Sequence, residues 1–407
     1  MKSTVPLFQA FVAIASARLL NPRQGIDTSL ADSQPSPTTA SIPIGPTFDS
    51  TTYDMSKATA SATESPLPVG TEPVTHRERD IYARQTACQP NPTGSGPKVT
   101  PDTDSAFVGN SAFATAASQA PKPTGYNQTF SNLHARAEAY GYLGFVVVDS
   151  YDTAGCADQC STVFRGCQSF NIFYERDPIV APSSGCNNPP STTNIKCVFW
   201  GGDLPATTAS NDGQYLADFH VVIAGSNGYL RNRVPSVPGY SGEPTGNNTI
   251  DAPPDDLDPD PGDTTTTTDI STSTTTGTFT NTSTGTSTST APTSTTTRRP
   301  GRGATGTYIG SKIFTNTYFD PQLCAAACDA QNRNNLENPP RRGRPQICRF
   351  FSTYLIYRNG EPIGQYCALY TTYYSRSFAT NSGTRSGGDT YRVRHAFSYR
   401  NMRAPQD

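Results

Sequence analysis

Two stretches of the chain carry hydrophobic patterns that predict strands. Residues 145–148 and 219–223 in the first stretch, and 391–399 in the second, are rich in aromatic and β-branched residues. The segments after Cys167 and Cys348 have the same composition. Such residues favour strands. We therefore expect each stretch to form a sheet.

One helix is expected in each stretch. The cysteine spacing Cys156-x3-Cys160 recurs as Cys324-x3-Cys328, with alanines between or beside the cysteines. Residues four apart lie on one face of a helix, and alanine favours that conformation. Each helix therefore presents two sulfur atoms to the same neighbour.

The two stretches repeat one another. Each has Tyr-x-Gly, an aromatic residue followed by Asp, the helical cysteine pair, a cysteine that opens an aromatic strand, and a last cysteine followed by further aromatics. This order indicates duplication of one unit. The expected fold class is α+β, with two small disulfide-stapled modules, each a helix on a small antiparallel sheet.

This pattern resembles the PAN/apple family of extracellular modules, in particular the repeats of secreted fungal apple-like proteins. The resemblance covers residues 126–240 well and 307–403 more loosely, and residues 167–177, 197–203 and 220–229 carry most of it. It implies that the first helical cysteine pairs with the last one, and the second with the strand cysteine. The implied pairs are Cys156–Cys197, Cys160–Cys167, Cys324–Cys367 and Cys328–Cys348. Cys88 and Cys186 are left over, and a bond between them would pin the preceding segment to the first module.

The rest of the chain is poor in core-forming residues. Hydrophobic residues make up 34% and charged residues 16% of the 407 residues, against roughly 45–50% and 25% in ordinary globular domains. One large core and a multi-span membrane protein are therefore excluded. The expected division is a signal peptide (1–17), a disordered Ser/Thr/Pro-rich stalk (18–125), module 1 (126–240), a disordered linker (241–306) and module 2 (307–403).

The linker is expected to act as a glycosylated spacer. It begins with an acidic, Pro-rich stretch and continues with 20 Thr and 6 Ser in residues 264–297. Tracts of this kind suit O-glycosylation, which extends the backbone. Arg298-Arg299 follows, and whether it is processed stays open.

The N-terminus predicts secretion. Lys2 precedes an apolar run, and Ala15-Ser16-Ala17 is a small-residue cleavage site. Ten cysteines, an even number, suit the oxidising extracellular space or cell wall. No later run is long enough to span a membrane. Sequons at Asn127, Asn247 and Asn281 fit the same route.

No catalytic, metal-binding or cofactor-binding motif is convincing. His76, His134, His220 and His395 lack metal-site spacing. The G-x-G-x-x-G match at residues 301–306 lacks a preceding strand, and the acidic residues from 256 lack the glycine of a calcium loop. We expect no enzyme activity, cofactor or metal, and nucleic acid is a poor candidate partner for an exported chain.

Charge and aromatic residues provide the candidate binding groups. Residues 298–407 carry a net charge of +10. Strand alternation places Arg392, Arg394 and Arg400 on one face, in a row suited to anionic polymers, although a merely solvated face fits equally well. The aromatic candidates for contacts with sugar rings are Tyr174, Trp200, Tyr215, Tyr357, Tyr370 and Tyr373. For any single one of them, core packing is the favoured interpretation.

The leading hypothesis is a non-catalytic secreted protein of a cell wall or matrix that binds extracellular glycans or proteins through both modules. Two weak sites joined by a spacer would bind with avidity. One alternative is a glycan hydrolase, for which Asp149, Asp152, Asp203 and Asp218 of module 1 are the first acids to inspect. Another is a structural wall protein in which the glycosylated tracts matter most.

Overall fold

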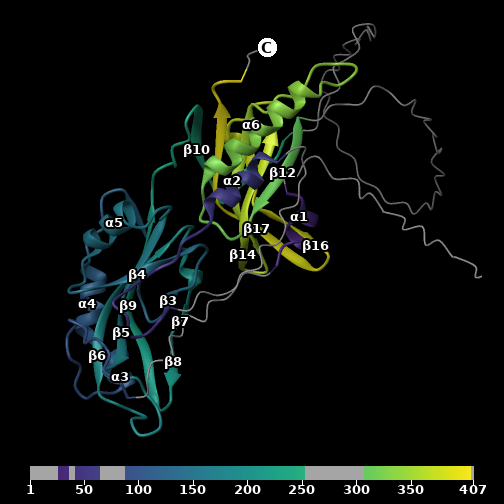
Figure 1. Cartoon of the computed structure of the whole chain (residues 1–407). Coiled ribbons are helices and arrows are strands. Elements are labelled where there is room, and N and C mark those ends of the chain that lie inside the picture. The colour runs from purple at the N-terminus through teal and green to yellow at the C-terminus, as the bar shows by residue number, and fades with distance from the viewer. Residues whose placement is uncertain (1–25, 36–41, 65–87, 253–306, 405–407) are drawn as a thin grey trace, which may run out of the picture. The chain divides into compact units, whose positions relative to one another are not determined.

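The computed structural model describes residues 26–35, 42–64, 88–252 and 307–404. The predicted signal peptide, the Thr/Ser tract, Asn281 and Arg298-Arg299 lie outside these residues. The described chain is α+β and mostly sheet (Figure 1). None of its helices is long and apolar enough to cross a membrane.

The first sheet has seven antiparallel strands, more than the small sheet expected. Its strands lie in the order β1 (Phe48–Ser50), β4 (Tyr142–Val148), β6 (Ser191–Trp200), β5 (Ser169–Pro178), β9 (Phe219–Arg231) and β2 (Tyr126–Leu133), with β8 (Gly213–Leu216) also paired to β9.

The second sheet has six antiparallel strands. Its strands lie in the order β10 (Tyr240–Gly246), β17 (Asp389–Asn401), β13 (Phe350–Arg358), β14 (Glu361–Tyr370) and β12 (Tyr308–Phe314), with β16 (Gly383–Ser386) also paired to β17.

The two sheets share one strand order. Read from β4 to β2, the first sheet matches the second read from β12 to β10, and β1 is an addition at the edge of the first. Each half also has a two-stranded sheet and a short 3-10 helix. These are β3 (Arg136–Ala137) with β7 (Ala209–Asn211) and η1 (Ala206–Thr208), then β11 (Thr249–Ile250) with β15 (Ala379–Asn381) and η2 (Arg376–Phe378).

The Cys-x3-Cys segments form the two expected helices, α5 (Thr153–Thr162) and α6 (Pro321–Glu337). Asp152 and Asp320 cap their first turns by accepting backbone hydrogen bonds. Disulfides tie each helix to its sheet. All ten cysteines are paired, as Cys88–Cys186, Cys156–Cys197, Cys160–Cys167, Cys324–Cys367 and Cys328–Cys348.

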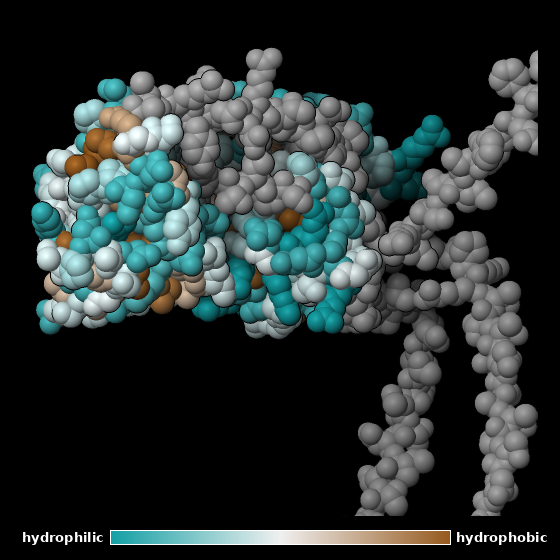
Figure 2. All heavy atoms as spheres, turned by 90° about the horizontal axis from the view of Figure 1, so that it is seen from below, coloured by the Kyte–Doolittle hydropathy of each residue, from teal (hydrophilic) through white to brown (hydrophobic). Residues whose placement is uncertain are grey.

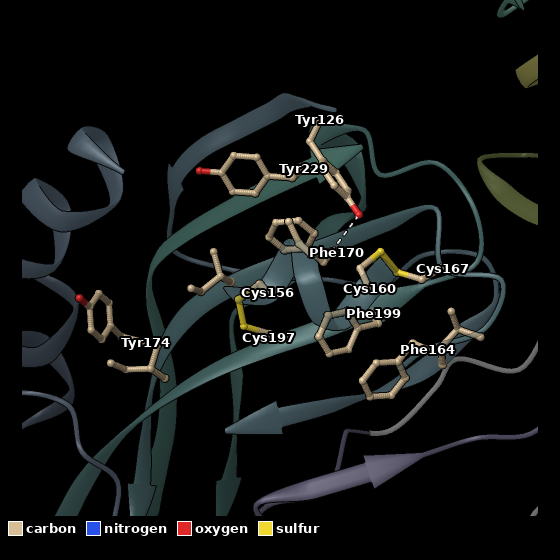
Figure 3. Packing of buried hydrophobic residues seen from close by; sticks show 14 of the residues in the cluster. Tyr126, Cys156, Cys160, Phe164, Cys167, Phe170, Tyr174, Cys197, Phe199 and Tyr229 are labelled. Carbon is tan, nitrogen blue, oxygen red and sulfur yellow. Dashed lines mark hydrogen bonds between the residues drawn. A yellow bond between two sulfur atoms is a disulfide. The ribbon is translucent and has the colours of Figure 1, made fainter. Parts of the chain in front are cut away.

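Aromatic rings surround the two helical disulfides of the first sheet (Figure 3). Phe170 of β5 stacks on Tyr229 of β9 with ring centroids 4.9 Å apart. Phe164, just after α5, stacks on Phe199 of β6 at 4.2 Å. The sulfur bridges and these rings together make the core that few aliphatic residues could have made.

The prediction that residues 18–125 are disordered is wrong for the parts of this region that the structure describes. Several of its isolated apolar residues lie in the cores of the two sheets: Leu30 packs in the cluster of Phe350 and Ile356, and Phe113 packs in that of Tyr174. Lys312 of β12 donates to carbonyls at the end of α2, a favourable place for a cation. Apart from β1, the ordered elements of this region are α1 (Thr28–Asp32), α2 (Met55–Thr63), α3 (Asp104–Val108) and α4 (Ser111–Gln119).

The start of the predicted linker also differs. Residues 240–250 form β10 and β11, and β10 pairs with β17 along Tyr240–Gly246. β12 then begins at Tyr308. The Thr/Ser tract therefore interrupts the second sheet between β11 and β12, where the first sheet has only residues 138–141 between β3 and β4. It is not a spacer between two complete sheets.

Candidate ligand-binding surface

Most of the aromatic candidates belong to the core. Four of the six are at most 4% exposed, namely Tyr174, Trp200, Tyr357 and Tyr370. Tyr174 stacks between Phe113 and Tyr151, with centroids at 4.2 and 5.0 Å, and burial raises the pKa of its hydroxyl. These four side chains cannot meet a ligand without unfolding, so they are withdrawn as binding residues.

Tyr357 has a further structural contact. Its hydroxyl donates a hydrogen bond of 2.7 Å to the buried carboxylate of Asp203. Burial raises the pKa of Asp203, and the hydrogen bond from Tyr357 opposes that shift. Asp203, one of the acids considered for hydrolysis, therefore lies inside the protein.

Tyr215 is the most exposed of the aromatic candidates, at 68%. It lies directly opposite His220 in the β8–β9 pairing. The two rings are stacked, with centroids 4.1 Å apart and planes inclined by 4°. His220 supports the tyrosine ring from one side, so the other aromatic face is free to meet a flat ligand.

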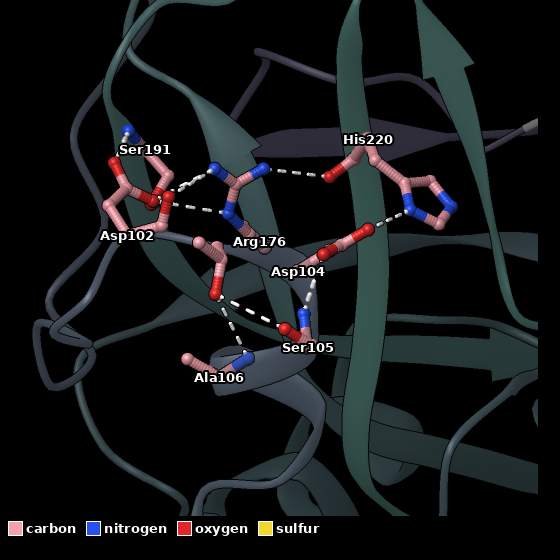
Figure 4. A network of polar contacts seen from close by, with 8 residues as sticks. Asp102, Asp104, Ser105, Ala106, Arg176, Ser191 and His220 are labelled. Atoms are coloured by element: carbon pink, nitrogen blue, oxygen red, sulfur yellow. Dashed lines mark hydrogen bonds and ion pairs between the residues drawn. The ribbon is translucent and has the colours of Figure 1, made fainter.

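Residues of the predicted stalk hold His220 in this position (Figure 4). Asp104, at the start of α3, contacts His220 through Oδ2 and Nδ1 at 2.8 Å. This hydrogen bond, together with one from the Ser105 backbone, lowers the pKa of Asp104. Thr103 caps α3 by accepting from the backbone of Ala106. The helix start thus orients the imidazole through a carboxylate.

An ion pair lies next to this contact. Arg176 donates to Asp102 at 2.8 Å and to the backbone oxygen of His220 at 2.9 Å, and its guanidinium lies 4.2 Å from the centroid of the Phe219 ring. Partial burial disfavours the Asp102 carboxylate, but hydrogen bonds from Ser191 and Arg176 outweigh this effect and lower its pKa. Arg176 therefore holds the backbone of His220, and Asp104 holds its side chain.

Tyr373 is the second exposed candidate, at 43%. Its ring lies edge-on to the buried Phe350, and the Arg400 guanidinium stands 5.1 Å from its centroid. The arginine covers part of the ring, so this pair offers a smaller aromatic surface than Tyr215.

The expected row of three arginines does not form. His395 adopts a positive φ of 51°, and the pairing of β13 with β17 shifts register between Thr353 and Leu355. Before this bulge Arg394 lies opposite Leu355, which packs around the disulfides, whereas Arg400 lies opposite Phe350 of the other face. The bulge thus separates Arg392 and Arg394 from Arg400.

The acids considered for hydrolysis have separate structural roles. Asp152 caps α5. Asp149 accepts a hydrogen bond of 2.8 Å from Ser95, and Asp218 is exposed beside the β8–β9 turn. Within the described ranges no group of three or more His, Cys, Asp or Glu side chains is placed to hold a metal ion.

Two of the three sequons can be located. Asn127 is exposed on β2, and Asn247 is exposed between β10 and β11. The side-chain oxygen of Asn247 also accepts from the backbone N–H of His395 at 3.4 Å.

One face of the protein is mostly polar. On the face drawn in Figure 2, hydrophobic residues form small separate spots among hydrophilic and intermediate ones. Such a surface suits a polar ligand that uses one aromatic contact better than a broad apolar partner.

Comparisons with family models, with curated proteins and with solved structures gave no match to this chain. The resemblance to PAN/apple modules therefore rests on the residues that suggested it.

Sequence reasoning missed Asp102 and Asp104 because it assigned them to the disordered stalk. One local signal was present. Thr103-Asp104-Ser105 directly precedes Ala106-Phe107-Val108, which is the pattern of a capped helix start.

Proposed function

We propose that this chain is a secreted, non-catalytic protein that binds extracellular carbohydrate, with Tyr215 of the first PAN/apple-like module as its main contact. The observation that carries the proposal is the exposed Tyr215 ring held flat on His220. The five disulfides are compatible with an extracellular protein.

The chemistry of the surface favours a sugar. The C–H faces of a pyranose ring pack against the electron-rich face of an aromatic side chain. The half-exposed carboxylate of Asp104 lies beside His220 and can accept hydrogen bonds from sugar hydroxyls. Because Asp104 and Arg176 already fix the site, little ordering entropy is lost on binding.

The test is retention on insoluble chitin, cellulose and a β-glucan. Wild-type protein should be retained on at least one of them above a reduced, unfolded control. Tyr215→Phe keeps the ring and should bind normally, whereas Tyr215→Ala should bind about tenfold more weakly. Tyr373→Ala is the matched control, since it removes an exposed tyrosine from the second sheet and should leave retention unchanged.

Two outcomes contradict the proposal. Absence of retention above the unfolded control argues against carbohydrate binding. Retention that survives Tyr215→Ala shows that the carbohydrate binds elsewhere.

A further inference from the structure

A buried cluster of charged side chains lies in the first sheet, on the face opposite α5. Lys196 of β6 is 0% exposed, and its ammonium contacts a carboxylate oxygen of Glu175. Asp177, 1% exposed, lies two residues further along β5, with its Oδ2 3.5 Å from the Lys196 nitrogen. The amide of Asn194 donates to the same Oδ2 at 2.6 Å.

One of the two carboxylate oxygens of Asp177 differs from the other charged atoms of this cluster. Oδ1 of Asp177 is buried and has no hydrogen-bond partner among the described residues. A buried carboxylate oxygen without a partner is costly, and a buried ion pair gains little over neutral groups of similar size. Replacing two buried charges with one neutral amide removes that cost.

We propose that Lys196 and Asp177 condense to an intramolecular isopeptide bond, with Glu175 as the proton carrier. The amine and the carboxylate are already close enough to interact, and neither can exchange its partner for bulk water. The bond would join the middle of β6 to the end of β5.

The step balances without any further reactant. Glu175 accepts a proton from the Lys196 ammonium, which frees the lone pair on Nζ. Nζ attacks Cγ of Asp177, while the hydrogen bond from Asn194 polarises the oxygen that remains as the amide carbonyl. Two of the three ammonium protons reach the other oxygen, one of them through Glu175, and the Cγ–O bond breaks. One water molecule leaves, and Glu175 returns to its initial state.

Glu175 is suited to this role. Burial and the neighbouring Asp177 raise its pKa to about 7, although Lys196 opposes the shift. A carboxyl group with a pKa near neutrality can both accept and return a proton. The Phe145 ring, 5.1 Å from the Lys196 nitrogen, shields the site from one side.

Tryptic peptide mapping tests the bond directly, because the sequence gives two different products. Trypsin cleaves after Arg176 and after a free Lys196, which releases residues 177–196 as one peptide. An acylated Lys196 is not cleaved. The linked protein should instead yield residues 177–231, lighter than the sequence mass by one water molecule. The full chain is reduced, alkylated and deglycosylated before digestion.

Lys196→Arg is the matched control. Trypsin must cleave after the substituted side chain, which cannot form the bond, so this variant releases residues 177–196 at full mass and shows that the peptide is detectable. Glu175→Gln should also release the unlinked peptide. A synthetic peptide of residues 177–196 replaces the control if the arginine variant is not produced.

The two results for the wild-type protein are exclusive. Residues 177–231 lacking one water, with fragment ions that place the loss between Asp177 and Lys196, support the bond. The free 177–196 peptide at full mass overturns it and leaves a buried ion pair only.

Discussion

The two sheets have the same strand order but differ at one place on the face away from the cysteine-bearing helix. In the first sheet that face holds Lys196, Glu175 and Asp177. The paired registers around Cys197 and Cys367 place Tyr366 where the first sheet has Lys196, and Ile356 where it has Glu175. The same strand arrangement thus buries a cluster of ionisable side chains in one copy and a cluster of tyrosines in the other.

The difference shows what fixes this fold. The helix face keeps its disulfides and stacked rings in both copies, so the architecture depends on that side. The opposite face is covered by different segments. The Pro43 oxygen accepts from Lys196, whereas Leu30 of α1 packs in the cluster of Tyr366. Each covering segment therefore contacts a different set of side chains, a polar one in the first sheet and an apolar one in the second.

The sharpest test of the contrast is removal of the central side chain in each copy. Lys196→Met removes the side chain that the buried Glu175 and Asp177 share, both as their cation and as the nitrogen donor of the proposed amide, and should lower the free energy of unfolding by about 3–5 kcal/mol. Tyr366→Phe removes hydrogen bonds with Ser311 and with the backbone N–H of Asp27, and should cost about 1–2 kcal/mol. Urea unfolding followed by circular dichroism measures both.

If both variants lost the same free energy of unfolding, the two clusters would not differ in the way proposed. The double variant should lose the sum of the two values, because the two positions belong to separate clusters.

Sequence patterns predicted the repeated elements well. The Cys-x3-Cys spacing identified α5 and α6, and aromatic runs identified β5, β13 and β17. Isolated apolar residues such as Leu30 and Phe113 carry no periodic signal, so their burial could not be predicted. β10 was missed because its Gly- and Pro-containing sequence looks like a turn, although its backbone completes the second sheet.

The candidate surface was predicted only in part. Alternation identifies a strand, but it does not show which segment covers each face, so Tyr215 could not be separated from the buried Tyr174 or Trp200. The bulge at His395 likewise depends on how β17 pairs with β13. A local pattern therefore gave a single arginine row where the structure has two faces.

The bulge provides a second test, through pH. His395 is 7% exposed and packs edge-on against Phe319 and Phe397, and burial lowers its pKa from 6.5 to about 4. Between pH 6.5 and pH 4, His395 is protonated in the unfolded chain but stays neutral in the folded protein. Stability should therefore fall by about 3 kcal/mol between pH 6.5 and pH 4, and this term should level off below that.

The control is His395→Asn, which tolerates the left-handed backbone but does not titrate. The difference in unfolding free energy between wild type and variant, measured across this range, isolates the histidine from all other acids. A difference that does not change with pH would show that His395 is solvated. The matching position in the first sheet is Gly225, which has a similar φ of 58°. A glycine side chain does not titrate, so this position contributes no pH dependence to stability.

The smallest effect is expected from cutting the chain inside the Thr/Ser tract. A specific protease site is placed within residues 253–306. Cleavage there puts β10 on the N-terminal fragment and β17 on the C-terminal fragment, although both strands belong to the second sheet. No disulfide crosses this point. We expect the two fragments to elute together on size-exclusion chromatography, with an unchanged circular dichroism spectrum, and to separate in urea without reductant.

This outcome distinguishes an insertion from a spacer. If the tract joined two complete modules, as its composition suggests, cleavage would release them as separate folded bodies in native buffer. The pairing of β10 with β17 along Tyr240–Gly246 instead holds the fragments together, with α2 against α6 as a second contact. Assembly becomes bimolecular after the cut, so dissociation on strong dilution is also expected. Dissociation at micromolar concentration in native buffer would show that β10 does not complete the second sheet.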